Sequence, residues 1–214
     1  MLLQDSVLSI VRVSSFLKTN KGCHSRFEER PPIQQKHITM IYSILSLLLA
    51  LNAISTNGQT LFQSQALTQH NLYRQKQCAP PLAFNQTIAD ISQAWAKSMS
   101  QTNTLQHSTN KLNGHSLGEN IGYMCSSTPS VINGSQPTAQ WYNEIAQYNF
   151  SNPGYSSATG HFTAVVWVAT KVFGIGISQS STNKCYYYVA NYYPAGNDIS
   201  SVTNFIQNVK KPPC

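Results

Sequence analysis

The chain has 214 residues, of which 41% are hydrophobic, so it can build one domain of ordinary size but not two. Its formal charge is +7 at pH 7, but the part after residue 55 holds only 8 basic and 4 acidic residues, a balance of about +4. No basic block or basic-aromatic stripe remains in that part, which argues against a nucleic-acid partner.

An apolar run from Ile41 to Ile54 follows Lys36 and His37. The run has 14 residues and includes polar ones, whereas a bilayer-spanning helix needs about 20 apolar residues. We therefore interpret residues 40–55 as a secretory signal peptide rather than a transmembrane anchor, and we expect a secreted, extracellular protein. Residues 1–39 have no clear hydrophobic period, which is typical of a disordered leader or of a gene-model extension.

Four of the five cysteines follow the predicted signal peptide, an even number in a chain bound for an oxidising compartment. Two disulfides are therefore expected, and the sequence leaves all three pairings open. The four residues are Cys78, Cys125, Cys185 and Cys214. Three N-glycosylation sequons, at Asn85, Asn133 and Asn149, fit the same compartment.

The first predicted helix covers residues 61–76, where Phe62, Ala66 and Tyr73 recur at helical spacing. His70 lies one turn after Ala66, so it points inward or into a cleft. A second helix is predicted over residues 87–99, and the polar stretch 100–116 is expected to be a loop.

A third helix is predicted from Pro137 to Tyr148, with Glu144 on its partly apolar face. The apolar run 162–168 fits either a short buried helix or a buried strand. Residues 171–178 and 185–192 are predicted strands joined by a hairpin connection, because they are β-branched and aromatic and are bounded by turn residues. From residue 198 onward the pattern predicts no element.

Two histidines and two glutamates lie in patterned segments with apolar neighbours. A buried carboxylate normally needs a cationic or hydrogen-bonding partner, because burying it alone costs several kcal/mol. Lysine and arginine are few and fall mostly on predicted surfaces, so the histidines are reasonable partners. The four residues are His70, His161, Glu119 and Glu144. Their spacing matches no local metal or triad signature, and His107 and His115 fall in the predicted loop.

Five segments in order carry a resemblance to a known family. The sequence resembles the CAP superfamily, which comprises cysteine-rich secretory proteins, antigen 5 and plant pathogenesis-related proteins, over about residues 61–199. The segments are His70–Arg74, Gly118–Ile121, Trp141–Glu144, Gly160–Thr163 and Asn191–Asn197.

The resemblance implies an α+β fold, an α-β-α sandwich with a central, mainly antiparallel sheet flanked by helices. It implies a CAP domain over residues 61–199, followed by a C-terminal tail at 200–214, and it favours a short helix at 162–168. The family's four cleft residues map onto His70, Glu119, Glu144 and His161. Many relatives have cysteines where this chain has Ile175 and Ala190, so their disulfides cannot be copied.

We interpret the chain as a secreted, non-enzymatic binding module for a sterol, fatty acid or other lipid, as several CAP relatives are. His70 and His161 are candidate ligands of zinc or another divalent cation, with Glu119 and Glu144 as cleft partners. A satisfied hydrogen-bonded cluster without an ion is the alternative to that metal site. A bound cation would be the only cofactor expected.

Two other functions stay open. One is a metal-assisted hydrolase or peptidase with Glu119 or Glu144 as general base, although no nucleophile elbow, H-E-x-x-H helix or triad order is present, so no catalytic residue is assigned. The other is a secreted factor for defence or host interaction, whose protein partner the sequence does not name and for which loop 126–136 could supply the surface. No cysteine-rich module follows Asn197, which argues against ion-channel blocking.

Overall fold

The computed structural model describes residues 59–126 and 132–213. The predictions for the leader at 1–39, the signal peptide at 40–55 and Cys214 fall outside these residues. All of the described residues belong to one compact unit, residues 55–214. No helix of the described part is both long and apolar enough to cross a bilayer.

Six helical segments and six strands make up the described part. In chain order they are α3 (Leu61–Lys76), β1 (Ala83–Phe84), α4 (Gln86–Thr102), β2 (Lys111–Leu112), β3 (His115–Ser116), β4 (Gly118–Cys125), α5 (Ser135–Tyr142), the 3₁₀ helix η2 (Asn143–Gln147), α6 (Gly160–Val166), β5 (Val172–Gln179), β6 (Cys185–Tyr193) and α7 (Val202–Asn208).

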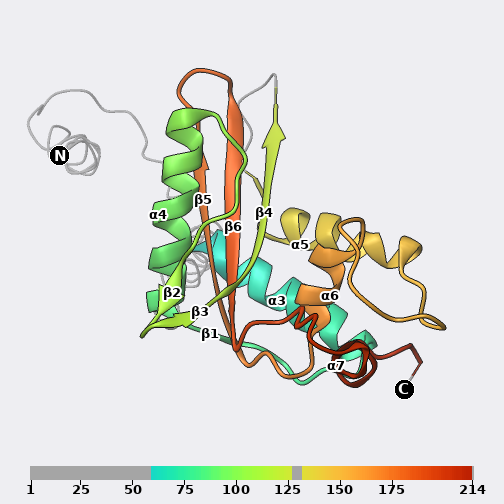
Figure 1. Cartoon of the computed structure of the whole chain (residues 1–214). Helices are drawn as coiled ribbons and strands as arrows, with labels where there is room; N and C mark the ends of the chain where they lie inside the picture. Colours follow the sequence, from blue (N-terminus) through green and yellow to red (C-terminus); the bar gives the residue numbers. More distant parts are fainter. Residues whose placement is uncertain (1–58, 127–131, 214) are drawn as a thin grey trace, which may run out of the picture. The chain divides into compact units, whose positions relative to one another are not determined.

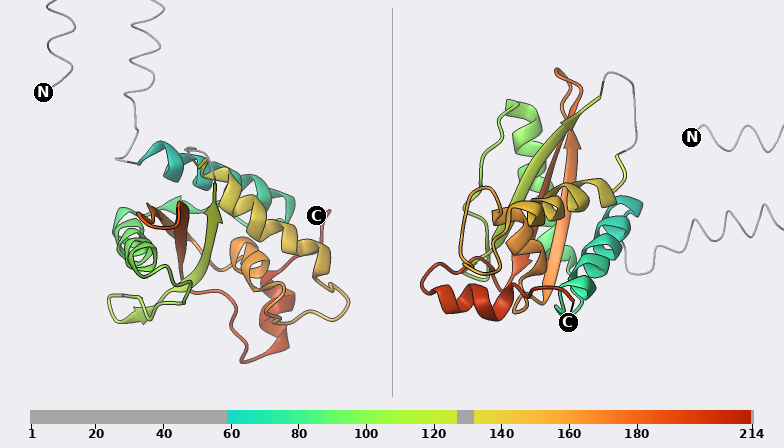
Figure 2. Two further views of the ribbon diagram at one scale, coloured as in Figure 1. Left: turned by 90° about the horizontal axis from the view of Figure 1, so that it is seen from above. Right: turned by 90° about the vertical axis from the view of Figure 1, so that its right-hand side faces the viewer.

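The expected α-β-α sandwich is confirmed. The main sheet has strand order β1-β5-β6-β4, with one parallel pair, β1 and β5, and antiparallel pairs elsewhere. Helix α4 covers one face of the sheet, and α3, α5 and α6 lie on the other side (Figures 1 and 2). Strand β4 forms one edge of this sheet, and its residues Gly118–Tyr123 carry the candidate site.

Strand β6 is buried on both faces, which explains its continuous run of aromatic and β-branched residues. Tyr187 and Val189 belong to the core between the sheet and α4, whereas Tyr188, Ala190 and Tyr192 belong to the core on the other face. Alternate side chains of a strand point to opposite faces, so one strand supplies both cores. These aromatic residues therefore fill the core rather than line a lipid-binding surface.

One disulfide, Cys125–Cys185, joins the facing ends of β4 and β6. Cys78 is also in a disulfide. Ile175 and Ala190, the positions where many relatives have cysteines, face each other across β5 and β6 and are fully buried. Two apolar side chains thus replace that bridge inside the core.

Three segments differ from the prediction or go beyond it. The third helix changes from α5 to the tighter η2 at residue 143, a change that apolar spacing alone does not reveal. The predicted loop 100–116 contains the end of α4 and the β2–β3 hairpin, whose turn is Asn113–Gly114 with φ values of 50° and 85°. Asn-Gly favours this turn because both positions need positive φ.

Residues 202–208 form α7, which packs Phe205 against Trp167 at 5.1 Å between ring centroids.

Candidate functional site

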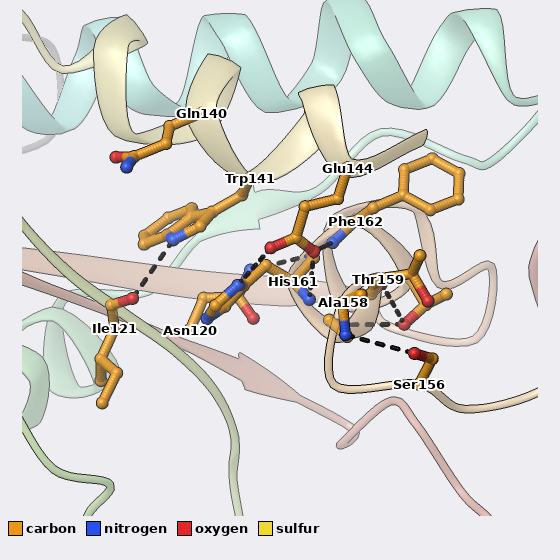
Figure 3. A network of polar contacts seen from close by, with 12 residues as sticks. Asn120, Ile121, Gln140, Trp141, Glu144, Ser156, Ala158, Thr159, His161 and Phe162 are labelled. Atoms are coloured by element: carbon orange, nitrogen blue, oxygen red, sulfur yellow. Dashed lines mark hydrogen bonds and ion pairs between the residues drawn. The ribbon is translucent and has the colours of Figure 1, made fainter. Parts of the chain in front are cut away.

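Glu144 and His161 form the first half of the site. One carboxylate oxygen of Glu144 accepts a hydrogen bond from His161 Nδ1 at 2.7 Å. The other oxygen accepts from the backbone N–H groups of His161 and Phe162 at 3.0 and 3.1 Å (Figure 3). A carboxylate of this kind satisfies donors at the start of a helix, so Glu144 both caps α6 and orients the His161 ring.

Glu119 and His107 form the second half. Glu119 lies on β4, and its Oε1 accepts from His107 Nδ1 at 2.9 Å and from the backbone N–H of Ser108 at 2.8 Å. Its Oε2 accepts from the Ser108 hydroxyl and from Asn191 Nδ2 at 2.5 and 3.2 Å. The Glu119 side chain is 8% exposed and that of His107 is 62% exposed. The buried carboxylate is therefore fully supplied with donors, whereas the imidazole faces solvent.

These contacts shift the pKa values of the second pair in opposite directions. Burial works against the charge of Glu119, but the hydrogen bonds from His107, Ser108 and Asn191 together lower its pKa. The hydrogen bond that His107 donates to Glu119, aided by the carboxylate charge, raises the pKa of His107 against a smaller opposing effect of burial. The pair is thus poised to hold a proton on His107 at higher pH than a free histidine does.

The two halves face one pocket at the β4 edge. This pocket has a volume of about 180 Å³, and His107, Glu119 and His161 are part of its wall together with Asn120 and Asn197. A second pocket of about 200 Å³ shares His161 and includes Glu144. The ring of His161 therefore forms a common wall between the two pockets.

Of the four predicted cleft residues, His70 lies outside the pocket, and His107 takes its place beside Glu119. His70 is fully buried between α3 and β6, where Nδ1 donates to Ala66 O at 2.8 Å and lies 3.0 Å from the Thr138 hydroxyl. Its Nε2 lies 2.9 Å from the Tyr192 hydroxyl. Because a carbonyl only accepts, Nδ1 carries the proton and Nε2 accepts from Tyr192. Burial lowers the pKa of His70 to about 3, so the ring is neutral and holds α3 to the sheet.

Helical spacing correctly placed His70 on the inward face but could not separate a core position from a cleft position. His107 was missed because it lies in a polar segment without periodicity. The neighbouring Ser108, which donates twice to the same carboxylate, becomes meaningful only once β4 is placed beside it. Glu119, Glu144 and His161, by contrast, all reach the predicted cleft.

Two asparagines link the site to the sheet. Asn120 Nδ2 donates to His161 O at 3.0 Å and to the Tyr192 hydroxyl at 3.3 Å, which joins the cleft to the buried His70. Asn197 Nδ2 donates to Gly160 O at 2.8 Å, and its Oδ1 accepts from the Thr163 hydroxyl at 2.6 Å. The last two of the five sequence segments are therefore hydrogen-bonded to each other at the start of α6.

Within residues 59–126 and 132–213, no three His, Cys, Asp or Glu side chains are grouped so as to hold one metal ion. The two imidazoles are the available nitrogen donors of the pocket. Each donates Nδ1–H to a glutamate, and neither Nε2 has a hydrogen-bond partner among the described residues.

Comparisons with known proteins show the family of the chain. The model of the cysteine-rich secretory protein family, CAP, matches residues 67–192. Human Golgi-associated plant pathogenesis-related protein 1 is 36% identical over 71% of this chain and 94% of its own length. Venom allergen 5.02 of Vespa crabro is 29% identical over 68% of this chain and 81% of its own.

A solved structure, titled as NaASP2 with Zn²⁺, shares the fold with a TM-score of 0.54 and 23% identity. The match covers 74% of this chain and 91% of that one.

Proposed function

Since the chain belongs to the CAP, or cysteine-rich secretory protein, family, we propose that it is a non-enzymatic binding domain whose polar pocket takes a divalent cation between His107 and His161. One observation carries the proposal. Both rings line the same pocket and donate Nδ1–H to a glutamate, so the tautomer with a bare Nε2 is favoured for each.

The donor set fits zinc. Neutral imidazole nitrogen is a common zinc ligand, and such a histidine usually donates its other N–H to a carboxylate or carbonyl. Two protein nitrogens are fewer than the three or four ligands of most zinc sites, so water or a bound molecule would complete the coordination. A bound zinc ion would offer these open positions to an oxygen or nitrogen atom of a ligand.

The hydrogen bonds of the two glutamates support a binding role over hydrolysis. Glu144 accepts three hydrogen bonds and Glu119 accepts four, all from protein donors. A general base needs an unoccupied basic position within reach of the proton that it removes. Both carboxylates instead hold backbone and imidazole donors in place, and we expect their main task to be positioning the two rings.

Zinc calorimetry tests the proposal. We expect wild-type protein to bind one zinc ion with measurable heat, and the His107→Ala, His161→Ala double variant to lose that heat because both nitrogen ligands are gone. His115→Ala is the matched control, since His115 is exposed on the β2–β3 hairpin outside the pocket. Equal heats for the wild type and the double variant would rule out a cation at these residues.

A lipid ligand is a second candidate function, favoured by a separate apolar pocket. This pocket has a volume of about 470 Å³, within the roughly 300–1,000 Å³ typical of small-molecule sites. Its wall comes from α3 and the following turn, and Leu72, which is 48% exposed, lies on it beside Ala79 and Pro81. We expect saturable fatty-acid or sterol uptake that Leu72→Asp weakens and Leu105→Asp leaves intact, whereas an absence of saturable uptake would remove this function.

Secretion is part of the proposal. The Cys125–Cys185 bridge supports passage through an oxidising compartment, where such bonds form and persist. A protein-interaction role through loop 126–136 stays a prediction, since residues 127–131 lie outside the described part.

A further inference from the structure

The second pocket at His161 differs in chemistry from the first. Its wall is mainly apolar, formed by Leu105, Ile121, Tyr123 and Trp141, and its polar residues are Gln140, Glu144 and His161. The Trp141 ring lies over His161 with 6.2 Å between centroids and 24° between planes. An apolar surface thus begins directly behind the imidazole that faces the polar pocket.

The wall of this pocket has a buried base, formed by Trp141, and an exposed rim, formed by Leu105 and Tyr123. Trp141 is only 2% exposed, and its indole N–H donates to Ile121 O at 3.3 Å (Figure 3). Leu105 and Tyr123 are 43% and 50% exposed, although both are large apolar or aromatic residues. A ligand group that covered them would gain apolar burial without moving the base.

Gln140 adds a hydrogen-bond donor to the same pocket. Its Oε1 accepts from the Tyr188 hydroxyl at 2.5 Å, which fixes the orientation of the amide. Its Nε2 has no partner among the described residues and remains able to donate. A carbonyl oxygen is the complementary ligand group.

We propose that the pocket of Leu105, Tyr123 and Trp141 is a side-chain subsite for a neutral amide ligand, such as a peptide unit with one apolar side chain of about leucine size. The apolar group packs on the wall, and its carbonyl groups lie toward Gln140 and the polar pocket. The orientation toward that pocket rests on the proposed cation site, whereas the apolar preference depends on the wall alone.

Charge and size both favour this ligand class. Glu119 and Glu144 are hydrogen-bonded to His107 and His161, and the two charges of a divalent cation would balance the two carboxylates, so a neutral ligand avoids an unpaired charge. The volume of about 200 Å³ is below the roughly 300 Å³ at which drug-sized pockets begin. The subsite therefore suits one side chain and excludes a whole sterol.

The probes for the test are N-acetyl-L-leucinamide and N-acetylglycinamide, titrated into the secreted protein with zinc and followed by ligand-observed NMR. We expect the leucine compound to bind about tenfold more tightly, because its side chain buries apolar surface that glycine lacks. Tyr123→Ser and Leu105→Ser should each reduce this ratio. Leu61→Ser is the control and should leave the ratio unchanged, because Leu61 is an exposed leucine at the start of α3 that lines neither this pocket nor the apolar pocket on α3.

Equal affinities of the two probes, or a preference that survives both Tyr123→Ser and Leu105→Ser, would overturn the subsite. Zinc calorimetry on the same samples separates this failure from that of the cation site. Zinc binding without a leucine preference overturns the subsite alone. A leucine preference without zinc binding upholds the subsite and overturns the proposed cation site.

Discussion

Replacing Arg74 by methionine is expected to destabilise the protein by about 4 kcal/mol, because the guanidinium donates to four backbone carbonyls, three of them in buried hydrogen bonds. Arg74 is fully buried in α3. Its Nε donates to Pro80 O at 2.7 Å, and its two terminal nitrogens donate to Val165 O, Trp167 O and Thr170 O at 2.9–3.0 Å. Methionine fills the space but makes none of these four hydrogen bonds, and Trp167 O then keeps only the Thr170 N–H as a donor.

The charge of Arg74 has no carboxylate partner in the described part of the chain. Burial lowers its pKa to about 10, which still leaves it protonated at neutral pH. Val165 O and Trp167 O belong to the C-terminal end of α6, where a cation suits the helix dipole. Arg74 therefore holds one end of α6 while Glu144 holds the other, and together they fix the position of His161.

Urea unfolding followed by circular dichroism measures this effect. Lys76→Met is the matched control, because Lys76 is exposed two residues further along α3 and its removal should change stability by at most about 0.5 kcal/mol. An Arg74→Met variant within about 1 kcal/mol of the wild type would contradict the role of the four hydrogen bonds.

Glu119 is expected to control the affinity of the proposed site for zinc. Glu119→Gln is expected to weaken zinc binding by about 10- to 100-fold, the usual result of losing a carboxylate that orients a ligating histidine. The same change should alter the pH dependence. Glu119 raises the pKa of His107, so in the wild type a proton competes with the cation at higher pH than it does for a free histidine. Without the carboxylate, that competition should move to lower pH.

Calorimetric zinc titrations between about pH 6 and pH 8 test both parts of this expectation, since the ordinary histidine pKa of about 6.5 lies in that range. Asp90→Asn is the control, because Asp90 is an exposed carboxylate on α4 that accepts a hydrogen bond from Gln86 and lies outside the pocket. A Glu119→Gln variant with unchanged affinity, or with an unchanged pH midpoint, would show that the pair does not act on the cation.

Much of the fold follows from the sequence because its main signals are strong. Helical spacing located α3 and α4, and the aromatic and β-branched runs located β5 and β6 to within about two residues. The family resemblance resolved residues 162–168, most of which belong to α6. The β2–β3 hairpin was readable in principle from Asn113–Gly114, but each of its strands has only two residues.

The site was less predictable, for a physical reason. Spacing shows which side chains face inward, but not whether an inward side chain meets the core or a cleft. His70 and Arg74 lie on the same inward face of α3, and the polar atoms of both form hydrogen bonds inside the protein. His107 lies outside any periodic segment and reaches the cleft only because Glu119 is placed on the sheet edge.

The most direct test of the account is a crystal structure of the protein grown with zinc. We expect one metal ion bound by Nε2 of His107 and Nε2 of His161 at about 2.0–2.1 Å, with both glutamates still on the Nδ1 atoms and His70 apart from the ion. Zinc coordinated directly by the carboxylate oxygens, or zinc bound elsewhere with nothing between the two rings, would contradict it.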